Sequence, residues 1–341
     1  GVLIHGSGGN SGIRQTDLTA DTFVVNTSEA VVIRDMSFRH SGTPTNGGAI
    51  RLGAGAAQNV KSKLHNLDIL GTYHGIILDT ATNWAIYSNY MDVRKNGIHI
   101  NPVTSPSSDE SRIIGNLFGC GNGDGTTSAI IILRGGGLEI SGNKVLGCSY
   151  GIEYAPLVAL TSVTITGNQF ENQGVAGIRV DCVNQTVVSS IAIVGNHIGA
   201  GVDGIHLGIA GQTSPTCPNA VTVTGNTAGG LSGTFLKIAA GNQIVVSGNG
   251  VASDTPGGVN VSVGATNIRV LDNYFAGTIP WAGNFANTRV SSFGTSATNA
   301  DLGTWANGSI IYCTDCTIAN PCAGAGTGAM AKRLNAVWVC N

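Results

Sequence analysis

The chain has 341 residues, and its 17 Lys and Arg against 19 Asp and Glu give a formal net charge of −2 at pH 7. Only 11% of the residues are charged, whereas 42% are hydrophobic and 51 are glycine. This composition excludes wholesale disorder, and the absence of a basic run argues against a nucleic-acid partner. Apolar stretches such as Ala129–Leu133 are far shorter than the roughly 18 residues of a membrane helix, so we expect no membrane insertion.

A short phrase, apolar-x-x-Asn-x-apolar, recurs along the chain and indicates the fold. Its asparagines are 27, 27, 25, 28, 30, 23 and 24 residues apart, and the third residue before each is Ile or Val. Asn tolerates the left-handed conformation at a tight corner, and stacked Asn side chains can hydrogen-bond along a ladder. We therefore interpret these positions as corners of successive coils. They are Asn89, Asn116, Asn143, Asn168, Asn196, Asn226, Asn249 and Asn273.

A second phrase, Gly-apolar-x-apolar, runs out of phase with the first. Two intervals between its glycines are 54 residues, twice the usual spacing, and the skipped turns hold Ala129–Ile130 and Leu236–Ile238. Apolar residues alternate within both phrases, which is the periodicity of a strand. The sequence thus predicts an all-β fold, a single-stranded parallel β-helix of roughly nine to eleven coils. The glycines are Gly75, Gly97, Gly151, Gly177, Gly204 and Gly258.

The opening segment carries a resemblance to a known family. The order of Gly1–Gly8, Thr22–Val25 and Val31–Phe38 resembles the first coils of right-handed, pectate-lyase-like β-helices, especially those of phage tailspikes and tail fibre depolymerases. The resemblance covers roughly residues 1 to 280. It implies a right-handed coil, a homotrimer and an extracellular protein, secreted or on a virion surface, with a polysaccharide as its partner.

The repeat ends after Phe275, so we expect a β-helix over residues 1–285 and a different unit over 286–341. The Ser/Thr/Asn/Ala-rich stretch 291–299 favours a linker. Strand-like segments at 309–313 and 336–340 flank a Gly-rich turn and predict a small β-hairpin module. An open solenoid end exposes unpaired edges, so we interpret this module as a cap or oligomerisation element.

Eight cysteines form an even set, and the first four fall within the repeat. Cys120 and Cys148 follow the repeat asparagines of adjacent coils by four and five residues. Coils about 4.8 Å apart place such residues within disulfide range, which predicts a bridge between them. Cys182 and Cys217 are a second candidate pair.

The last four cysteines are ambiguous from spacing alone. Cys313, Cys316, Cys322 and Cys340 favour two disulfides over a zinc site, because a zinc ribbon has two close Cys pairs and here the last cysteine stands apart. Disulfides in turn favour an oxidising, extracellular setting.

Aligning the glycine phrases identifies one outward-facing surface that collects charged residues, whereas the other visible faces carry mainly Thr, Ser, Ala and Val. This asymmetry predicts a carbohydrate-binding surface. The candidate substrate-binding residues are His74, Asp79, His99, Asn101, Tyr150, Arg179, His206 and Lys237. The candidate catalytic residues are Glu153, Asp181 and Asp203.

Glu153 and Asp181 lie on adjacent coils and two residues out of column, which places their Cα atoms roughly 8 Å apart. That separation suits an inverting hydrolase, with Glu153 as the acid and Asp181 as the base, and Asp203 is an alternative for either role. A structural role is equally open, because Glu153 stacks directly across from Arg179 and opposite charges pair there.

The motifs that mark related enzymes are missing. The chain has no Asn-Thr-Asp, Asp-Asp or Gly-His-Gly of polygalacturonases, no acidic calcium cluster of pectate lyases and no Gly-x-Ser-x-Gly elbow. No histidine has metal-ligand spacing, so we expect neither metal nor cofactor.

Three functions remain open from the sequence. The first is an extracellular tailspike-like protein that binds a bacterial surface polysaccharide, with hydrolysis as an additional activity. The second is a non-catalytic structural or adhesive β-solenoid. The third is a polysaccharide lyase or epimerase, for which Tyr150 with His99 or Arg179 is the local candidate. An enzyme should have a concave polar groove with two carboxylates within about 10 Å, whereas a scaffold should show the charges paired.

Overall fold

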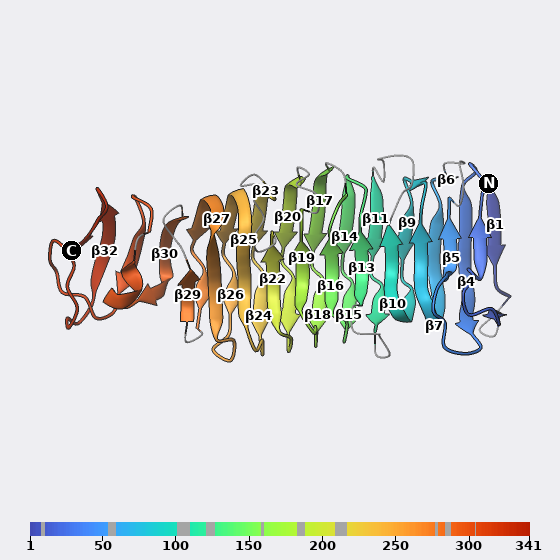
Figure 1. Ribbon diagram of the computed structural model, residues 1–341, viewed down its shortest axis with the longest axis horizontal. Coiled ribbons are helices and arrows are strands. Elements are labelled where there is room, and N and C mark those ends of the chain that lie inside the picture. The colour runs from blue at the N-terminus through green and yellow to red at the C-terminus, as the bar shows by residue number, and fades with distance from the viewer. Residues whose placement is uncertain are drawn as a thin grey trace.

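The computed structural model describes residues 1–7, 11–53, 59–100, 110–120, 127–157, 160–182, 188–208, 217–276, 279–283, 288–303 and 305–341. These residues form an elongated parallel β-helix of about nine turns, with the two termini at opposite ends of the rod (Figure 1). The predicted all-β parallel solenoid is therefore confirmed. No helix in this part of the chain is long and apolar enough to cross a membrane.

Each coil is built from three strands, and equivalent strands of successive coils pair in parallel. Strands that end before the repeat asparagines form the asparagine face, strands that follow them form the short face, and strands of the glycine phrase form the glycine face. The asparagine face holds β9 (Ala85–Tyr87), β11 (Ser111–Ile114), β14 (Leu138–Ser141), β17 (Leu160–Thr166), β20 (Val188–Val194) and β23 (Asn219–Thr224). The short face holds β12 (Leu117–Gly119), β15 (Lys144–Leu146), β18 (Gln169–Glu171), β21 (His197–Gly199), β24 (Thr227–Gly229), β26 (Gly250–Val251) and β28 (Tyr274–Phe275). The glycine face holds β3 (Phe23–Val25), β5 (Gly48–Leu52), β13 (Ser128–Ile132), β16 (Tyr150–Tyr154), β19 (Ala176–Val180), β22 (Asp203–Leu207) and β29 (Ile279–Gly283).

Longer strands continue around a corner and join two faces of one coil. They are β4 (Val31–His40), β7 (Lys63–Leu78), β10 (Tyr90–Ile100), β25 (Thr234–Ser247) and β27 (Gly257–Leu271). At the N-terminal end β1 (Val2–His5) and β2 (Gly12–Gln15) both pair with β4, and β6 (Asn59–Val60) pairs with β8 (Ala81–Thr82).

The register confirms the two turns in which the glycine phrase is interrupted. Ile130 pairs with Ile98, and Leu236 pairs with Ile205. Where glycine is present, the interior explains it: a Cβ atom at Gly151 would lie 2.3 Å from Cδ1 of Phe170 and 2.4 Å from the carbonyl oxygen of Gly177. The buried ring and the next coil therefore leave room for glycine alone.

The repeat asparagines form a continuous buried ladder, as predicted. Asn168 illustrates it: its Oδ1 accepts from the backbone N (3.0 Å) and Nδ2 (2.9 Å) of Asn143, and its Nδ2 donates to Oδ1 of Asn196 (3.0 Å). The same Nδ2 also donates to the carbonyl of Ile140, at 2.9 Å. The pattern extends from Asn89 to Asn273.

The repeat asparagines do not themselves adopt the left-handed conformation that the sequence analysis assigned to them. The left-handed residue is the one before each asparagine, and it is glycine in six of the eight coils; the exceptions are Ser88 (φ 55°) and Asp272 (φ 49°). Glycine adopts this conformation without steric cost, so the asparagine is selected for its buried hydrogen bonds and the preceding residue for its backbone.

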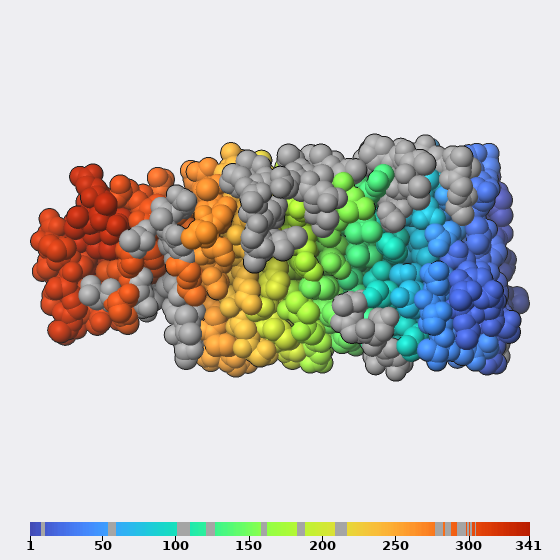
Figure 2. Space-filling model, viewed as in Figure 1, coloured from blue at the N-terminus to red at the C-terminus, as the bar shows by residue number. Residues whose placement is uncertain are grey.

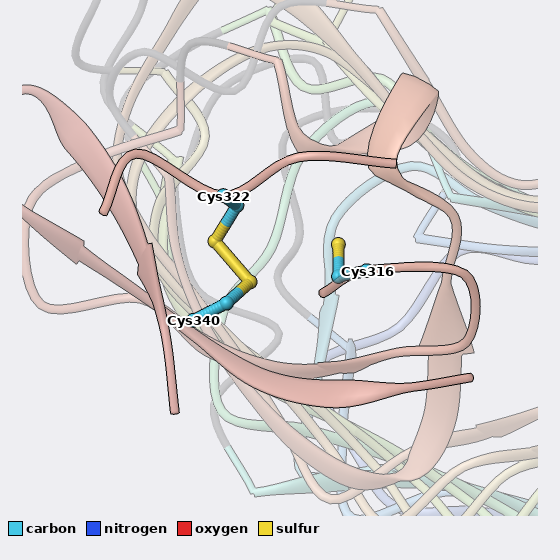
Figure 3. A group of neighbouring side chains, drawn as sticks. All are labelled: Cys316, Cys322 and Cys340. Atoms are coloured by element: carbon cyan, nitrogen blue, oxygen red, sulfur yellow. A yellow bond between two sulfur atoms is a disulfide. The ribbon is translucent and has the colours of Figure 1, made fainter. Parts of the chain in front are cut away.

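The eight cysteines form four disulfides. Cys120–Cys148 joins adjacent coils with Cα atoms 4.9 Å apart, and Cys182–Cys217 joins a second pair of segments, both as predicted. The last four pair as Cys313–Cys316 and Cys322–Cys340. Figure 3 shows the Cys322–Cys340 bond beside Cys316, and the sulfur of Cys316 is bonded to that of Cys313.

The C-terminal end departs from one sequence prediction. Residues 291–297, predicted as linker, belong to β30 (Thr288–Ala297), which pairs in parallel with β27 and places Val290 in the core. β30 then pairs with β31 (Ile310–Cys313), after the 3-10 helix η2 (Asn299–Leu302). β31, β32 (Ala329–Leu334) and β33 (Val337–Cys340) are antiparallel, and the rod narrows toward them (Figure 2).

Candidate functional site

The glycine face carries its outward side chains in straight columns across the coils. Ile131 of β13 pairs with Glu153 of β16, Glu153 pairs with Arg179 of β19, and the column continues through His206 of β22 to Lys237 of β25. Because alternate strand residues point to opposite sides, these side chains all face outward while their neighbours fill the core. Strand register thus brings side chains together that are 22 to 31 residues apart in sequence.

Arg179 is the centre of a group of polar side chains that we call the central cluster: Tyr150, Glu153, Arg179, Asp181, Asp203, His206 and Lys237. Its Nη1 donates to the Tyr150 hydroxyl at 2.8 Å and lies 3.5 Å from Oε1 of Glu153. Its Nη2 forms an ion pair with Oδ2 of Asp181, and its Cζ lies 4.9 Å from the centre of the Tyr150 ring. The guanidinium therefore stands between the two predicted catalytic carboxylates.

The two carboxylates have different surroundings. Glu153 has both oxygens engaged, since the Ser128 hydroxyl donates to Oε2 at 2.7 Å and Arg179 contacts Oε1. Asp181 is only 2% exposed, and its Oδ1 is buried with no hydrogen-bond partner. Burial raises the pKa of Asp181 above its ordinary value, although the charge of Arg179 opposes this effect.

Asp203 is held as a carboxylate by three donors. Nε2 of His206 lies 3.0 Å and Nζ of Lys237 2.6 Å from its Oδ2, and the backbone N of Thr234 donates to Oδ1 at 2.7 Å. Burial favours the neutral form, but these hydrogen bonds outweigh it and lower the pKa of Asp203 to about 2. A carboxyl group so fully ionised and bonded is a poor proton donor near neutral pH.

A small recess lies over the central cluster, and we call it the central recess. Its volume is about 290 Å³, and its wall includes Tyr150, Arg179, Asp181, His206 and Lys237. Donors and acceptors from four adjacent coils thus meet at one hollow, which is the usual composition of a small-ligand site. Glu153 lies outside this wall.

A second group, the N-terminal cluster, consists of Asp21, Arg51, His74, Asp79 and His99. Arg51 bridges two carboxylates, with its Nε 2.5 Å from Oδ2 of Asp21 and its Nη1 2.7 Å from Oδ2 of Asp79. The sequence interpretation missed Asp21. The coil of Asp21 lacks the glycine phrase that aligned the later coils; its register is visible only in the structure, where Phe23, two residues after Asp21, pairs with Ile50 of the next coil.

The rings of His74 and His99 contact each other within this cluster, with their centres 5.1 Å apart and their planes tilted by 46°. Nδ1 of His74 and Nε2 of His99 are buried without a hydrogen-bond partner. Burial lowers the pKa of His99. Burial, together with the charge of the neighbouring His99, also lowers the pKa of His74, to about 3. Both rings are therefore neutral near pH 7.

The predicted surface residues divide into these two clusters rather than one continuous site. Ser128 and Ile131 of β13 lie on the coil between them. The remaining predicted residue, Asn101, lies outside the described residues.

The strand pairing defines a parallel β-helix, and several solved structures share this fold. A mutant tailspike of E. coli bacteriophage HK620, solved with a pentasaccharide, matches with a TM-score of 0.58 at 8% identity, over 88% of this chain and 59% of that chain. DFA-IIIase of Arthrobacter chlorophenolicus A6 without its lid matches with a TM-score of 0.55 at 15% identity, over 80% of this chain and 75% of that chain. PfbA, a surface adhesin of Streptococcus pneumoniae, matches with a TM-score of 0.50 at 15% identity, over 93% of this chain and 69% of that chain. At these identities the likeness shows the fold, and the chain spans about 59% of the tailspike it resembles.

The chain belongs to the NosD family. The family model, described as periplasmic copper-binding protein (NosD), matches residues 119–301. No curated protein matches the chain in sequence.

The described side chains of the matched segment do not fit a copper site. Copper prefers thiolate, thioether and imidazole ligands, but the four cysteines of this segment are paired in disulfides. His206 is bonded to Asp203, and His197 is exposed and lies 3.0 Å from the Thr227 hydroxyl. Among the described residues outside the segment, groups of three close ligand atoms occur only at cysteines 313–340, and those sulfurs are also bonded to each other.

Proposed function

We propose that this protein binds a polysaccharide on its glycine face, at the central recess. The observation that carries the proposal is the convergence of Tyr150, Arg179, Asp181, His206 and Lys237 on one hollow, in a chain with only 11% charged residues. Sugar hydroxyls both donate and accept hydrogen bonds, and this wall offers both: ammonium and guanidinium donors, and the Tyr150 hydroxyl, which can also accept.

Three further facts support the proposal. The fold is shared with a tailspike solved with a pentasaccharide and with a surface adhesin. The rod presents adjoining coils in one line, which suits an extended polymer. The four disulfides support an oxidising location outside the cytoplasm, where such polymers occur. An extracellular location and the trimer expected from the tailspike resemblance remain predictions.

A titration of the protein with bacterial capsular and O-antigen polysaccharides, followed calorimetrically, tests this proposal. Lys237→Met should weaken the binding of the active polymer about tenfold, the loss of about 1.4 kcal/mol. Lys144→Met is the matched control, because Lys144 has nearly the same side-chain exposure (43% against 42%) and also pairs with a carboxylate, but on the short face. Equal losses in both variants, or no binding to any polymer, would refute the central recess as the site.

Hydrolysis is the second candidate, favoured by one observation. Asp181 combines a raised pKa with a position in the wall of the recess, as a general acid requires. This exchanges the roles expected from sequence, because Glu153 has both oxygens engaged. Chain length of the bound polymer, followed by size-exclusion chromatography, is expected to fall with the parent protein and not with Asp181→Asn. Binding without shortening would leave the protein a binder only.

A further inference from the structure

A larger recess lies where the last coils meet the C-terminal strands, away from both clusters of the glycine face. Its volume is about 830 Å³, and we call it the C-terminal recess. β25 and β27 of the solenoid, β30 and the segment after η2 form its wall. The lining residues are Gln243, Val245, Thr266, Asn267, Ile268, Arg269, Arg289 and Ala306.

Two arginines stand directly opposite each other in this wall. Arg269 of β27 pairs in register with Arg289 of β30, and neighbouring parallel strands are about 4.8 Å apart. Like charges in this arrangement repel each other. Both arginine side chains are exposed and line the recess. Among the described residues, no carboxylate forms an ion pair with either of them.

Another pair of opposed arginines shows how the chain neutralises such a contact elsewhere. Arg14 and Arg39 are also in register on neighbouring strands, but Oδ2 of Asp68 lies 3.3 Å from Nη2 of Arg39. Arg51 and Arg179 each contact two carboxylates. The C-terminal recess therefore lacks a negative partner that comparable positions possess.

Neutral hydrogen-bonding groups complete the wall. Gln243 and Asn267 both have left-handed backbone conformations (φ 55° and 52°) and project from consecutive corners. Nδ2 of Asn267 donates to Oδ1 of Asn242 at 2.6 Å, which leaves the Asn267 Oδ1 as an acceptor. On the far side, the position of a Cβ at Gly308 would be 3.3 Å from Nε of Arg289, so this guanidinium lies against the backbone of the C-terminal unit.

We propose that the C-terminal recess binds the carboxylate of an acidic sugar in a polysaccharide, held between Arg269 and Arg289. A guanidinium presents paired N–H donors that match a carboxylate, and two of them around one anion would replace a repulsive contact by an attractive one. Gln243 and Asn267 would hydrogen-bond to the hydroxyl groups of the same sugar. This inference rests on the proposed function, since it assumes a polysaccharide ligand, and it adds a second site and a charge preference.

The test compares Arg269→Gln/Arg289→Gln with Arg14→Gln/Arg39→Gln, which removes the same charge from another opposed pair. Binding to a polyuronate and to the same polymer with its carboxyl groups reduced to alcohols is measured at low and moderate salt. We expect the first variant to bind the polyuronate at least tenfold more weakly, and the control variant to bind it as the parent does. The reduced polymer should bind all three proteins equally.

Each other outcome has a distinct meaning. Equal losses in the two variants, or parent binding that ignores reduction of the carboxyl groups, would overturn the inference. If duplex DNA binds as tightly as the polyuronate and this binding also depends on the two arginines, the recess binds polyanions in general. That result would overturn the inference as well. The proposed function is judged separately, by comparing Lys237→Met with Lys144→Met, because neither of these lysines lines the C-terminal recess. Thermal unfolding provides a folding control: Arg269→Gln/Arg289→Gln should not lower the melting temperature, because it relieves repulsion.

Discussion

The asparagine ladder and the glycine face are built on the same coils but follow opposite rules. In the ladder every coil contributes the same buried side chain, and each Asn repeats the bonds of the one before it. On the glycine face the residue changes with every coil, from Glu153 to Arg179 to His206. Uniform positions maintain the fold, whereas positions that vary within a fixed column are free to acquire a ligand.

The difference predicts that the ladder is the more sensitive region. Asn168→Ala removes a buried amide that satisfies the backbone N and Nδ2 of Asn143 and the carbonyl of Ile140. Leaving such groups unbonded costs about 1–3 kcal/mol each, so we expect a loss of at least about 3 kcal/mol in the free energy of unfolding. Urea denaturation measures it. Thr164→Ala, at an exposed position on the same coil, should change stability by less than about 0.5 kcal/mol.

The charged face should respond to single substitutions through its buried carboxylate. Arg179→Gln leaves Asp181 buried without its cation, and we expect a loss of about 2 kcal/mol at pH 7. The loss should become smaller as the pH falls, because protonation removes the buried charge of Asp181. Arg112→Gln, which breaks an exposed ion pair with Glu139, is the control. A loss in Arg179→Gln that does not depend on pH would contradict this explanation.

The smallest expected effect is a change in the pH dependence of stability. In the folded protein the pKa of His74 is about 3, whereas an unfolded histidine titrates near 6.5. Between these values the unfolded chain binds the additional proton, so stability decreases as the pH falls from about 6.5 toward about 3. His74→Phe should reduce this slope by up to about one proton, as measured by denaturation at a series of pH values.

Sequence reasoning predicted the features that repeat and missed two features that occur once. The ladder, the columns of the glycine face and the Cys120–Cys148 bridge all follow from a period of about 27 residues. The salt bridge from Arg51 to Asp21 was missed, because the first coil lacks the glycine phrase that would have aligned it. β30 was missed for a related reason: its Ser- and Thr-rich sequence becomes a strand by pairing with β27 and β31, which no local pattern records.

The position of the guanidinium of Arg179 also lay beyond the sequence. Spacing placed Glu153 and Asp181 on neighbouring coils, and the structure agrees. Spacing did not show that one side chain bonds to both carboxylates, since this depends on rotamers rather than on register.

The ladder has a consequence for how this rod can change in length during evolution. Each Asn bonds to its counterpart on the next coil, so a whole coil can be duplicated or deleted and the remaining Asn side chains still meet. The central cluster has no such freedom, because Asp203 depends on Lys237 of the following coil. We therefore expect length differences among related chains to fall between the two clusters or beyond them, and seldom inside one.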